Sequence, residues 1–338
     1  MPRPVFIFKM VDWRHILPYN VTCRQQMEEA LKAADNSLNG SGRLFIVVFS
    51  WILITFISDL PDIVSKLLLG QVPAWFPWAK IAAMALSVAL TLAWKKARTL
   101  LPFASVMLVL FAALAGSEWV KTQSWWTTLL PDNLNNFALS FLRPYLRDIG
   151  VVLAVMATLW IIHRKRSPFF LAKGNLEAPV GPIHWLGIKP GESWSRFAWI
   201  FGVIAALAVA LPTMLALKPS PSLLLKALPL LPACLLYAAI NAFNEELYFR
   251  ASMLSTLVGV VGKEQALLIS SVFFGLAHWL YGSPPGLVGF AMTGFLAWIL
   301  GRSMLETRGL LAPWLIHFLP DVVIFYSYAL SYVQQAGK

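Results

Sequence analysis

The sequence contains few charged residues. They occupy 13% of its 338 positions, whereas hydrophobic residues occupy 58%. A chain with so little polar surface cannot bury its apolar surface in a water-soluble fold, which excludes an ordinary soluble protein. Cysteine is rarer still, because Cys23 and Cys234 are the only two and they have no metal-ligand spacing. Neither a disulfide framework nor a zinc finger is therefore predicted.

Long apolar runs are what the sequence has instead of charge. Runs of roughly 15 to 23 residues recur along the chain, and each can cross a hydrocarbon core about 30 Å thick with some tilt. We therefore expect an all-α fold, a polytopic transmembrane helical bundle of about eight or nine spans. The expected spans are residues 44–60, 80–94, 99–116, 149–163, 196–217, 223–256 with a break at Pro229 and Pro232, 265–281, 286–301 and 310–332.

The net charge of +11 would suggest a nucleic-acid partner in a soluble protein. Here the basic residues lie in short loops beside the apolar runs, as in residues 95–98 and 163–166. This pattern is typical of cytoplasmic loops in membrane proteins and predicts that the N-terminal segment 1–43 is also cytoplasmic. Membrane lipid, and not nucleic acid, is the expected partner of this integral multi-pass protein.

The apolar runs fall into two groups. Residues 164–195 are rich in proline and glycine, and they predict a connector between an N-terminal transmembrane region, 44–163, and a C-terminal core, 196–338. The role of the N-terminal region does not follow from its sequence. Its segment 117–148 contains several tryptophans and is predicted to lie at the membrane interface. No internal repeat is evident, which disfavours an inverted-repeat transporter.

The stretch NAFNEELYFR, residues 241–250, places three charged residues inside an apolar run. Charges within a span are costly, so each needs a partner or a function. Glu246 and Arg250 are four positions apart on one helix face and can form an ion pair with a purely architectural role. Glu245 points about 100° away and shares its face with Asn241. It is a candidate general base, and the alternative is a carboxyl group that only bonds a neighbouring helix.

Two further motifs place polar residues in the following spans. The sequence FGLAH runs from Phe274 to His278, and HFLPD runs from His317 to Asp321. A single histidine near a membrane interface is usually a hydrogen-bonded structural residue. His317 and Asp321, however, are four positions apart, so the carboxylate can orient the imidazole or both can face one cavity. Pro320 cannot complete the helical hydrogen bond to residue 316 and is expected to bend the helix there.

A glutamate and two histidines can hydrolyse a peptide bond. The reaction needs a base that takes a proton from water, a group that orients the water, and a donor for the oxyanion. Glu245, His278 and His317 would supply these in that order. A zinc site made from the same three side chains and a water molecule is a chemical alternative, although the sequence has no HExxH motif.

Together the three motifs, EExxxR, FxxxH and HxxxD, resemble those of the CAAX protease and bacteriocin-processing (CPBP, ABI) family of intramembrane glutamic endopeptidases, which includes the type II CAAX prenyl endopeptidases. The resemblance covers roughly residues 196–338. It implies that Glu245 is the general base, that His278 positions the water, and that His317 and Asp321 form the oxyanion site.

In the same resemblance, Glu246, Arg250 and Phe274 support the site structurally. Eukaryotic prenyl proteases have asparagine at the position of Asp321. Since a carboxyl group donates a hydrogen bond only when protonated, Asp321 either is protonated or instead orients His317.

We therefore expect an intramembrane endopeptidase that uses glutamate-activated water and no cofactor, with zinc as the alternative. Its expected substrate is a peptide or protein, either of the prenylated CAAX type or another membrane-associated peptide. Two other classes stay open. One is a non-catalytic membrane scaffold or bacteriocin-immunity protein, in which the polar residues serve packing. The other is a proton-coupled transporter, in which glutamate and histidine form a relay.

Overall fold

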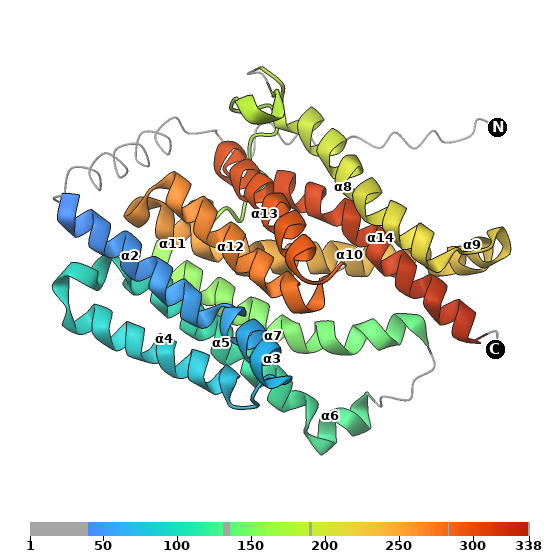
Figure 1. The fold of residues 1–338 in the computed structure, drawn as a ribbon, viewed down its shortest axis with the longest axis horizontal. Coiled ribbons are helices and arrows are strands. Elements are labelled where there is room, and N and C mark those ends of the chain that lie inside the picture. The colour runs from blue at the N-terminus through green and yellow to red at the C-terminus, as the bar shows by residue number, and fades with distance from the viewer. Residues whose placement is uncertain (1–39, 131–135, 189–190, 283, 337–338) are drawn as a thin grey trace, which may run out of the picture.

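The computed structural model describes residues 40–130, 136–188, 191–282 and 284–336. Helices are the regular elements of these residues, and β pairing among them is confined to two isolated bridges in the connector (Figure 1). The all-α expectation is confirmed. Most of the predicted cytoplasmic segment 1–43, including Cys23, lies outside the described residues, as do residues 131–135, 189–190, 283 and 337–338.

The chain runs through two series of helices. Those before the connector are α2 (Gly40–Ile57), α3 (Leu60–Leu69), α4 (Phe76–Ala93), the 3-10 helix η2 (Lys95–Leu100), α5 (Leu101–Lys121), α6 (Ser124–Leu129) and α7 (Phe137–His163). The connector contains the 3-10 turns η3 (Ser167–Phe169) and η4 (His184–Leu186). Those after it are α8 (Trp194–Leu217), α9 (Pro221–Ala227), η5 (Leu228–Leu230), α10 (Leu231–Glu245), the π-helix η6 (Glu246–Ala251), α11 (Ser252–Val261), α12 (Lys263–Tyr281), α13 (Leu287–Thr307) and α14 (Leu311–Ala336).

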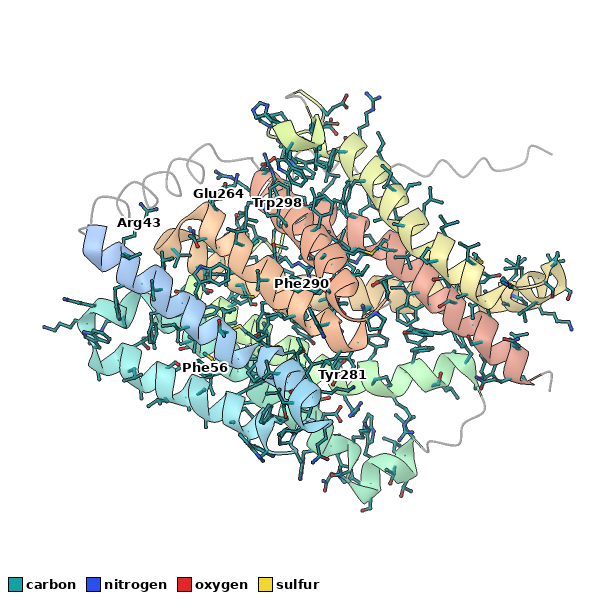
Figure 2. The ribbon with its side chains drawn as sticks, in the orientation of Figure 1. Arg43, Phe56, Glu264, Tyr281, Phe290 and Trp298 are labelled. Atoms are coloured by element: carbon teal, nitrogen blue, oxygen red, sulfur yellow. The ribbon has the colours of Figure 1, made fainter. Side chains whose placement is uncertain are left out.

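Seven helical segments of the described residues are long and apolar enough to cross a membrane, or eight if α2 and α3, bent by 47° at residues 58–59, form one broken span. Large apolar side chains such as Phe56 project from the outer surface, as expected of a protein surrounded by lipid (Figure 2). The chain is thus an integral membrane protein. The expected span at 265–281 is helix α12, but polar residues such as Gln265 and His278 lower its hydropathy, and it is not among the seven.

Two of the expected spans can be compared with the helix boundaries in the structure. The break expected near Pro229 is present as η5, which separates α9 from α10. The expected span at 149–163 is longer than predicted, because α7 begins at Phe137 and includes Pro144 within the helix. Residues 137–148 therefore belong to a membrane-crossing helix and not only to an interfacial segment.

One hydrophobic core joins the two series of helices. Its buried members include Leu53 of α2 and Met107 of α5 from the first series, and Leu254 of α11 and Leu267 of α12 from the second. Helix α7 contacts both α5 and α10. The N-terminal helices therefore pack directly against the segment that carries the charged motifs.

The connector is packed against the turn between α13 and α14. The amide of Asn175 donates a 2.8 Å hydrogen bond to the carbonyl of Thr307. Beside it, Gly174 has a positive φ of 80°, and a Cβ atom there would lie 2.9 Å from the Cα of Gly309. Glycine is needed at this position for both reasons. The close contact fixes where α14, with its histidine motif, begins.

The basic loops gather at one end of the bundle. The 3-10 helices η2 and η3, which adjoin the clusters at 95–98 and 164–166, both contact α11. Lys263, at the start of α12, lies 3.7 Å from Glu306 near the end of α13. This clustering at one end is what the positive-inside pattern requires, and the cytoplasmic orientation of that end stays a prediction.

Candidate active site

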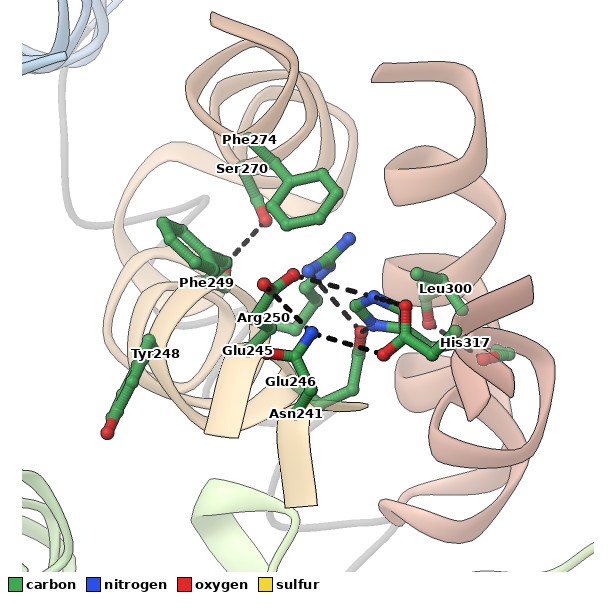
Figure 3. A network of polar contacts seen from close by, with 12 residues as sticks. Asn241, Glu245, Glu246, Tyr248, Phe249, Arg250, Ser270, Phe274, Leu300 and His317 are labelled. Atoms are coloured by element: carbon green, nitrogen blue, oxygen red, sulfur yellow. Dashed lines mark hydrogen bonds and ion pairs between the residues drawn. The ribbon is translucent and has the colours of Figure 1, made fainter. Parts of the chain in front are cut away.

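The helix that carries NAFNEELYFR changes its winding within the motif. α10 ends at Glu245, and residues Glu246–Ala251 form a π-helical turn before α11 begins. A π turn displaces backbone carbonyls from their usual partners, and two of these carbonyls accept hydrogen bonds from side chains. Ser252 donates to the carbonyl of Tyr248, and Ser270 of α12 donates a 2.7 Å hydrogen bond to the carbonyl of Phe249 (Figure 3). Such turns are frequent at functional sites, because they re-aim side chains.

Glu246 is the buried centre of the charge cluster. Its side chain is 0% exposed, and its Oε1 atom lies 3.3 Å from Nη1 of Arg250, so the predicted ion pair is present. The same Oε1 accepts a 2.8 Å hydrogen bond from Nδ1 of His317, which lies 71 positions further along the chain (Figure 3). Glu246 therefore joins its own helix to α14 and holds the histidine ring in one orientation.

Arg250 is enclosed by the ion pair and an aromatic ring. Its side chain is 0% exposed, and its guanidinium carbon lies 3.8 Å from the centroid of the Phe274 ring. Its nitrogen atoms make no hydrogen bond to any residue that the structure describes. The charge of Glu246 and the π face of Phe274 are thus what stabilises this buried cation. Phe274 therefore contacts the charge cluster directly.

Glu245 differs from Glu246 because it is partly accessible. Its side chain is 24% exposed, and its Oε1 atom accepts a 3.1 Å hydrogen bond from Nδ2 of Asn241. Its Oε2 atom lies 3.4 Å from Nε2 of His317 and makes no hydrogen bond to a described residue. One carboxylate oxygen is therefore held in place, and the other faces the histidine and can accept a proton.

Asp321 is linked to Glu245 by one amide. Asn241 donates to Oδ2 of Asp321 at 3.1 Å as well as to Glu245. The distance from Oδ1 of Asp321 to Nε2 of His317 is 3.8 Å, which is close enough for charge attraction but too long for a hydrogen bond. Nε2 of His317 consequently faces two carboxylates, while Nδ1 is bonded to a third.

His278 lies at the edge of this cluster. Its Nδ1 bonds the Phe274 carbonyl at 2.9 Å, and a carbonyl can only accept, so the neutral ring carries its proton on Nδ1 and presents Nε2 as an acceptor. The Phe274 ring lies 4.3 Å from the His278 ring and 6.0 Å from the His317 ring, measured between centroids. Among the described residues, His278 makes no direct bond to Glu245.

The zinc alternative depends on whether the polar side chains form a ligand set. Nowhere in the described part of the chain do three or more histidine, cysteine, aspartate or glutamate side chains form a group that could hold a metal ion. Nδ1 of His317 and Nδ1 of His278 are each bonded to an oxygen atom, which leaves Nε2 as the nitrogen of each ring that could coordinate a metal. The zinc alternative and independence from any cofactor both stay predictions.

The structure brings together Glu245, Glu246, Arg250, His317 and Asp321, and adds a residue that the motif analysis assigned no role. This residue is Asn241, which bridges two of the carboxylates. Its position four residues before Glu245 was the available signal, because residues with this spacing share a helix face. The bond between Glu246 and His317 had no such signal, since the two residues lie on different helices.

A comparison with protein-family models gives one match. The model described as type II CAAX prenyl endopeptidase Rce1-like matches residues 227–323, which include all of the motif residues. The resemblance drawn from the motifs is therefore confirmed for this part of the chain. No curated protein and no solved structure matches the chain.

Proposed function

We propose that this protein is an intramembrane endopeptidase of the CAAX type, in which Glu245 activates the water that hydrolyses a peptide bond. The observation that carries the proposal is the difference between the two adjacent glutamates. The Glu246 side chain is 0% exposed and contacts both His317 and Arg250, whereas the Glu245 side chain is 24% exposed and lies beside Nε2 of His317. A general base needs a carboxylate within reach of water.

The proposed reaction begins with a water molecule between Glu245 and the substrate carbonyl. Oε2 of Glu245 takes a proton as the water oxygen attacks the carbonyl carbon, and the carbonyl π electrons move onto its oxygen. The protonated Glu245 then delivers that proton to the leaving nitrogen as the C–N bond breaks. The products are a new carboxyl terminus and a new amino terminus, with no covalent intermediate.

The histidines have separate roles in this proposal. Nε2 of His317 lies beside Oε2 of Glu245. In the imidazolium form both ring nitrogens carry a proton, so Nδ1 donates to Glu246 while Nε2 can donate to the developing oxyanion. His278 presents Nε2 as an acceptor and is the residue proposed to orient the attacking water. Asp321 attracts the His317 ring electrostatically and is held by Asn241.

The remaining polar residues support this geometry. The Glu246 carboxylate keeps the His317 ring fixed, and Arg250, stacked on Phe274, balances the charge of Glu246. Groups fixed before the substrate binds need no reorganisation during the reaction, which is the main source of electrostatic catalysis.

The proposed substrate is a membrane-associated peptide or protein. The name of the matching family points to prenylated CAAX sequences, and seven helical segments of the described residues are long and apolar enough to cross a membrane. A lipidated peptide would partition into the bilayer and reach the site from there. A bacterial inner membrane is the proposed location, with membrane lipid as the surrounding partner, and neither nucleic acid nor a metal cofactor takes part.

The experiment compares purified wild type with Glu245→Gln on a pool of membrane-derived peptides, including CAAX peptides with and without a prenyl group. New termini are identified by mass spectrometry, with and without a chelator. Glu264→Gln is the matched control, because Glu264 is an exposed carboxylate at the start of α12. We expect the Glu245 variant to lose at least about 100-fold in rate.

Cleavage by wild type and by Glu264→Gln, unaffected by the chelator, would support the proposal. Cleavage that the chelator abolishes would point to a metal enzyme. If wild type releases no product from any peptide, the proposal is wrong and a non-catalytic scaffold or a transporter should replace it.

A further inference from the structure

One polar contact to the site comes from outside the family match. Tyr145 belongs to α7, in the N-terminal region, whereas the match covers residues 227–323. Its hydroxyl group donates a 3.1 Å hydrogen bond to Oδ1 of Asn241, the residue that bridges Glu245 and Asp321. The side chain is half-buried.

The ring of Tyr145 is held by aromatic residues one helical turn from the site. It stacks on Tyr237 with 5.4 Å between centroids and 9° between planes, and lies 6.4 Å from Phe325. Tyr237 is four positions before Asn241 on α10, and Phe325 is four positions after Asp321 on α14. The tyrosine hydroxyl is thus positioned by the same two helices that carry the bridged groups.

The hydroxyl group of Tyr145 determines which way the Asn241 amide can face. Both N–H groups of the amide are used, one by Glu245 and one by Asp321, and its oxygen accepts from Tyr145. If the amide were turned by about 180°, its oxygen would face two carboxylates and repel them. The tyrosine hydroxyl would then face an NH₂ group, to which it cannot donate. Tyr145 therefore favours the one orientation that supports both carboxylates.

We propose that Tyr145 is a positioning residue for the hydrolysis, acting through Asn241 to hold Oε1 of Glu245 and Oδ2 of Asp321. The inference rests on the proposed function of Glu245 as the general base. It assigns a role to the N-terminal region, because α7 completes a site whose other members lie on α10, η6, α12 and α14. Fixing Oε1 leaves Oε2 of Glu245 aimed at His317, where the proton is transferred.

The test compares Tyr145→Phe with Tyr237→Phe as a matched control. Tyr237 is in the same aromatic cluster, but its hydroxyl donates a 2.6 Å bond to the backbone carbonyl of Ala138 and not to the site. Both variants keep the ring and lose one hydrogen bond. We expect Tyr145→Phe to lower kcat about 10-fold, because misaligned groups slow the chemical step. The KM and the unfolding temperature of Tyr145→Phe should equal those of Tyr237→Phe.

A double variant tests whether Tyr145 acts through Asn241. If it does, Tyr145→Phe should slow the wild type but should not slow Asn241→Ala any further. Rate losses that multiply in the double variant would overturn the inference, as would a Tyr145→Phe rate equal to that of Tyr237→Phe. In either case cleavage by wild type would still support the proposed function. A wild type that cleaves nothing would instead overturn the proposed function, and this inference with it.

Discussion

Two of the charge clusters among the described residues, one around Lys80 and one around Glu245, differ in how closely their members are paired. In the N-terminal region, Nζ of Lys80 on α4 lies 2.8 Å from Oδ1 of Asp59 and 2.6 Å from Oδ2 of Asp62, at the bend between α2 and α3. One cation is thus shared closely by two carboxylates. The charge contacts of this triad are short, although Oδ2 of Asp62 makes no hydrogen bond to a described residue.

The charge contacts in the cluster around Glu245 are longer. Three carboxylates face one guanidinium and one imidazole, and the ion-pair distances are 3.3 to 3.8 Å apart from the single 2.8 Å bond between Glu246 and His317. Oε2 of Glu245, Oε2 of Glu246 and the three guanidinium nitrogens of Arg250 make no hydrogen bond to the described residues. An arrangement of this kind costs stability, and such costs are typical of sites that act on another molecule.

The largest effect on stability is expected from Arg250→Met. The substitution leaves Glu246 buried without its cation and removes the contact with Phe274, so we expect a loss of about 3 to 5 kcal/mol in the free energy of unfolding. Thermal unfolding in detergent would measure it. Arg196→Met is the matched control, because Arg196 also pairs with a glutamate four positions away but is 69% exposed.

The control should change stability by less than about 1 kcal/mol. If the two arginine variants are equally stable, the burial of the Glu246–Arg250 pair does not matter for folding. The cluster would then be less dependent on Arg250 than its geometry indicates.

A smaller effect is expected from Lys80→Met. The change leaves two partly exposed carboxylates without their shared cation, and we expect a loss of about 1 to 3 kcal/mol in stability. The rate of cleavage by the protein that stays folded should be unchanged, because Lys80 is not part of the site. Parallel measurement of unfolding and of peptide cleavage would check both. A cleavage rate that falls while the unfolding temperature stays the same would remove the distinction between the clusters.

Much of the site could be predicted from local spacing. The pair of Glu246 and Arg250, and the placement of Glu245 on another face beside Asn241, follow from the positions of these residues on one helix, and the structure contains both contacts. The family match covers the residues of the same motifs. The all-α bundle followed from composition and long apolar runs, because only helices and closed barrels can cross a bilayer.

Contacts between distant segments could not be predicted in this way. The bond between His317 and Glu246 depends on how α14 packs, and the π turn at Glu246–Ala251 depends on neighbours such as Ser270 of α12. Tyr145 was missed because the segment around it, rich in tryptophan and arginine, was interpreted as interfacial. The triad of Lys80 was missed because its members lie at the edges of apolar runs, where boundaries are least certain.

The central claim is that the two adjacent glutamates have separate functions, and one paired measurement tests it. The initial cleavage rate and the unfolding temperature are determined for Glu245→Gln and Glu246→Gln, each an isosteric change that removes one charge. We expect Glu245→Gln to abolish cleavage and to leave the unfolding temperature unchanged. Glu246→Gln should instead lower the unfolding temperature, because Arg250 loses its partner. Full cleavage by a stably folded Glu245→Gln protein would contradict the claim.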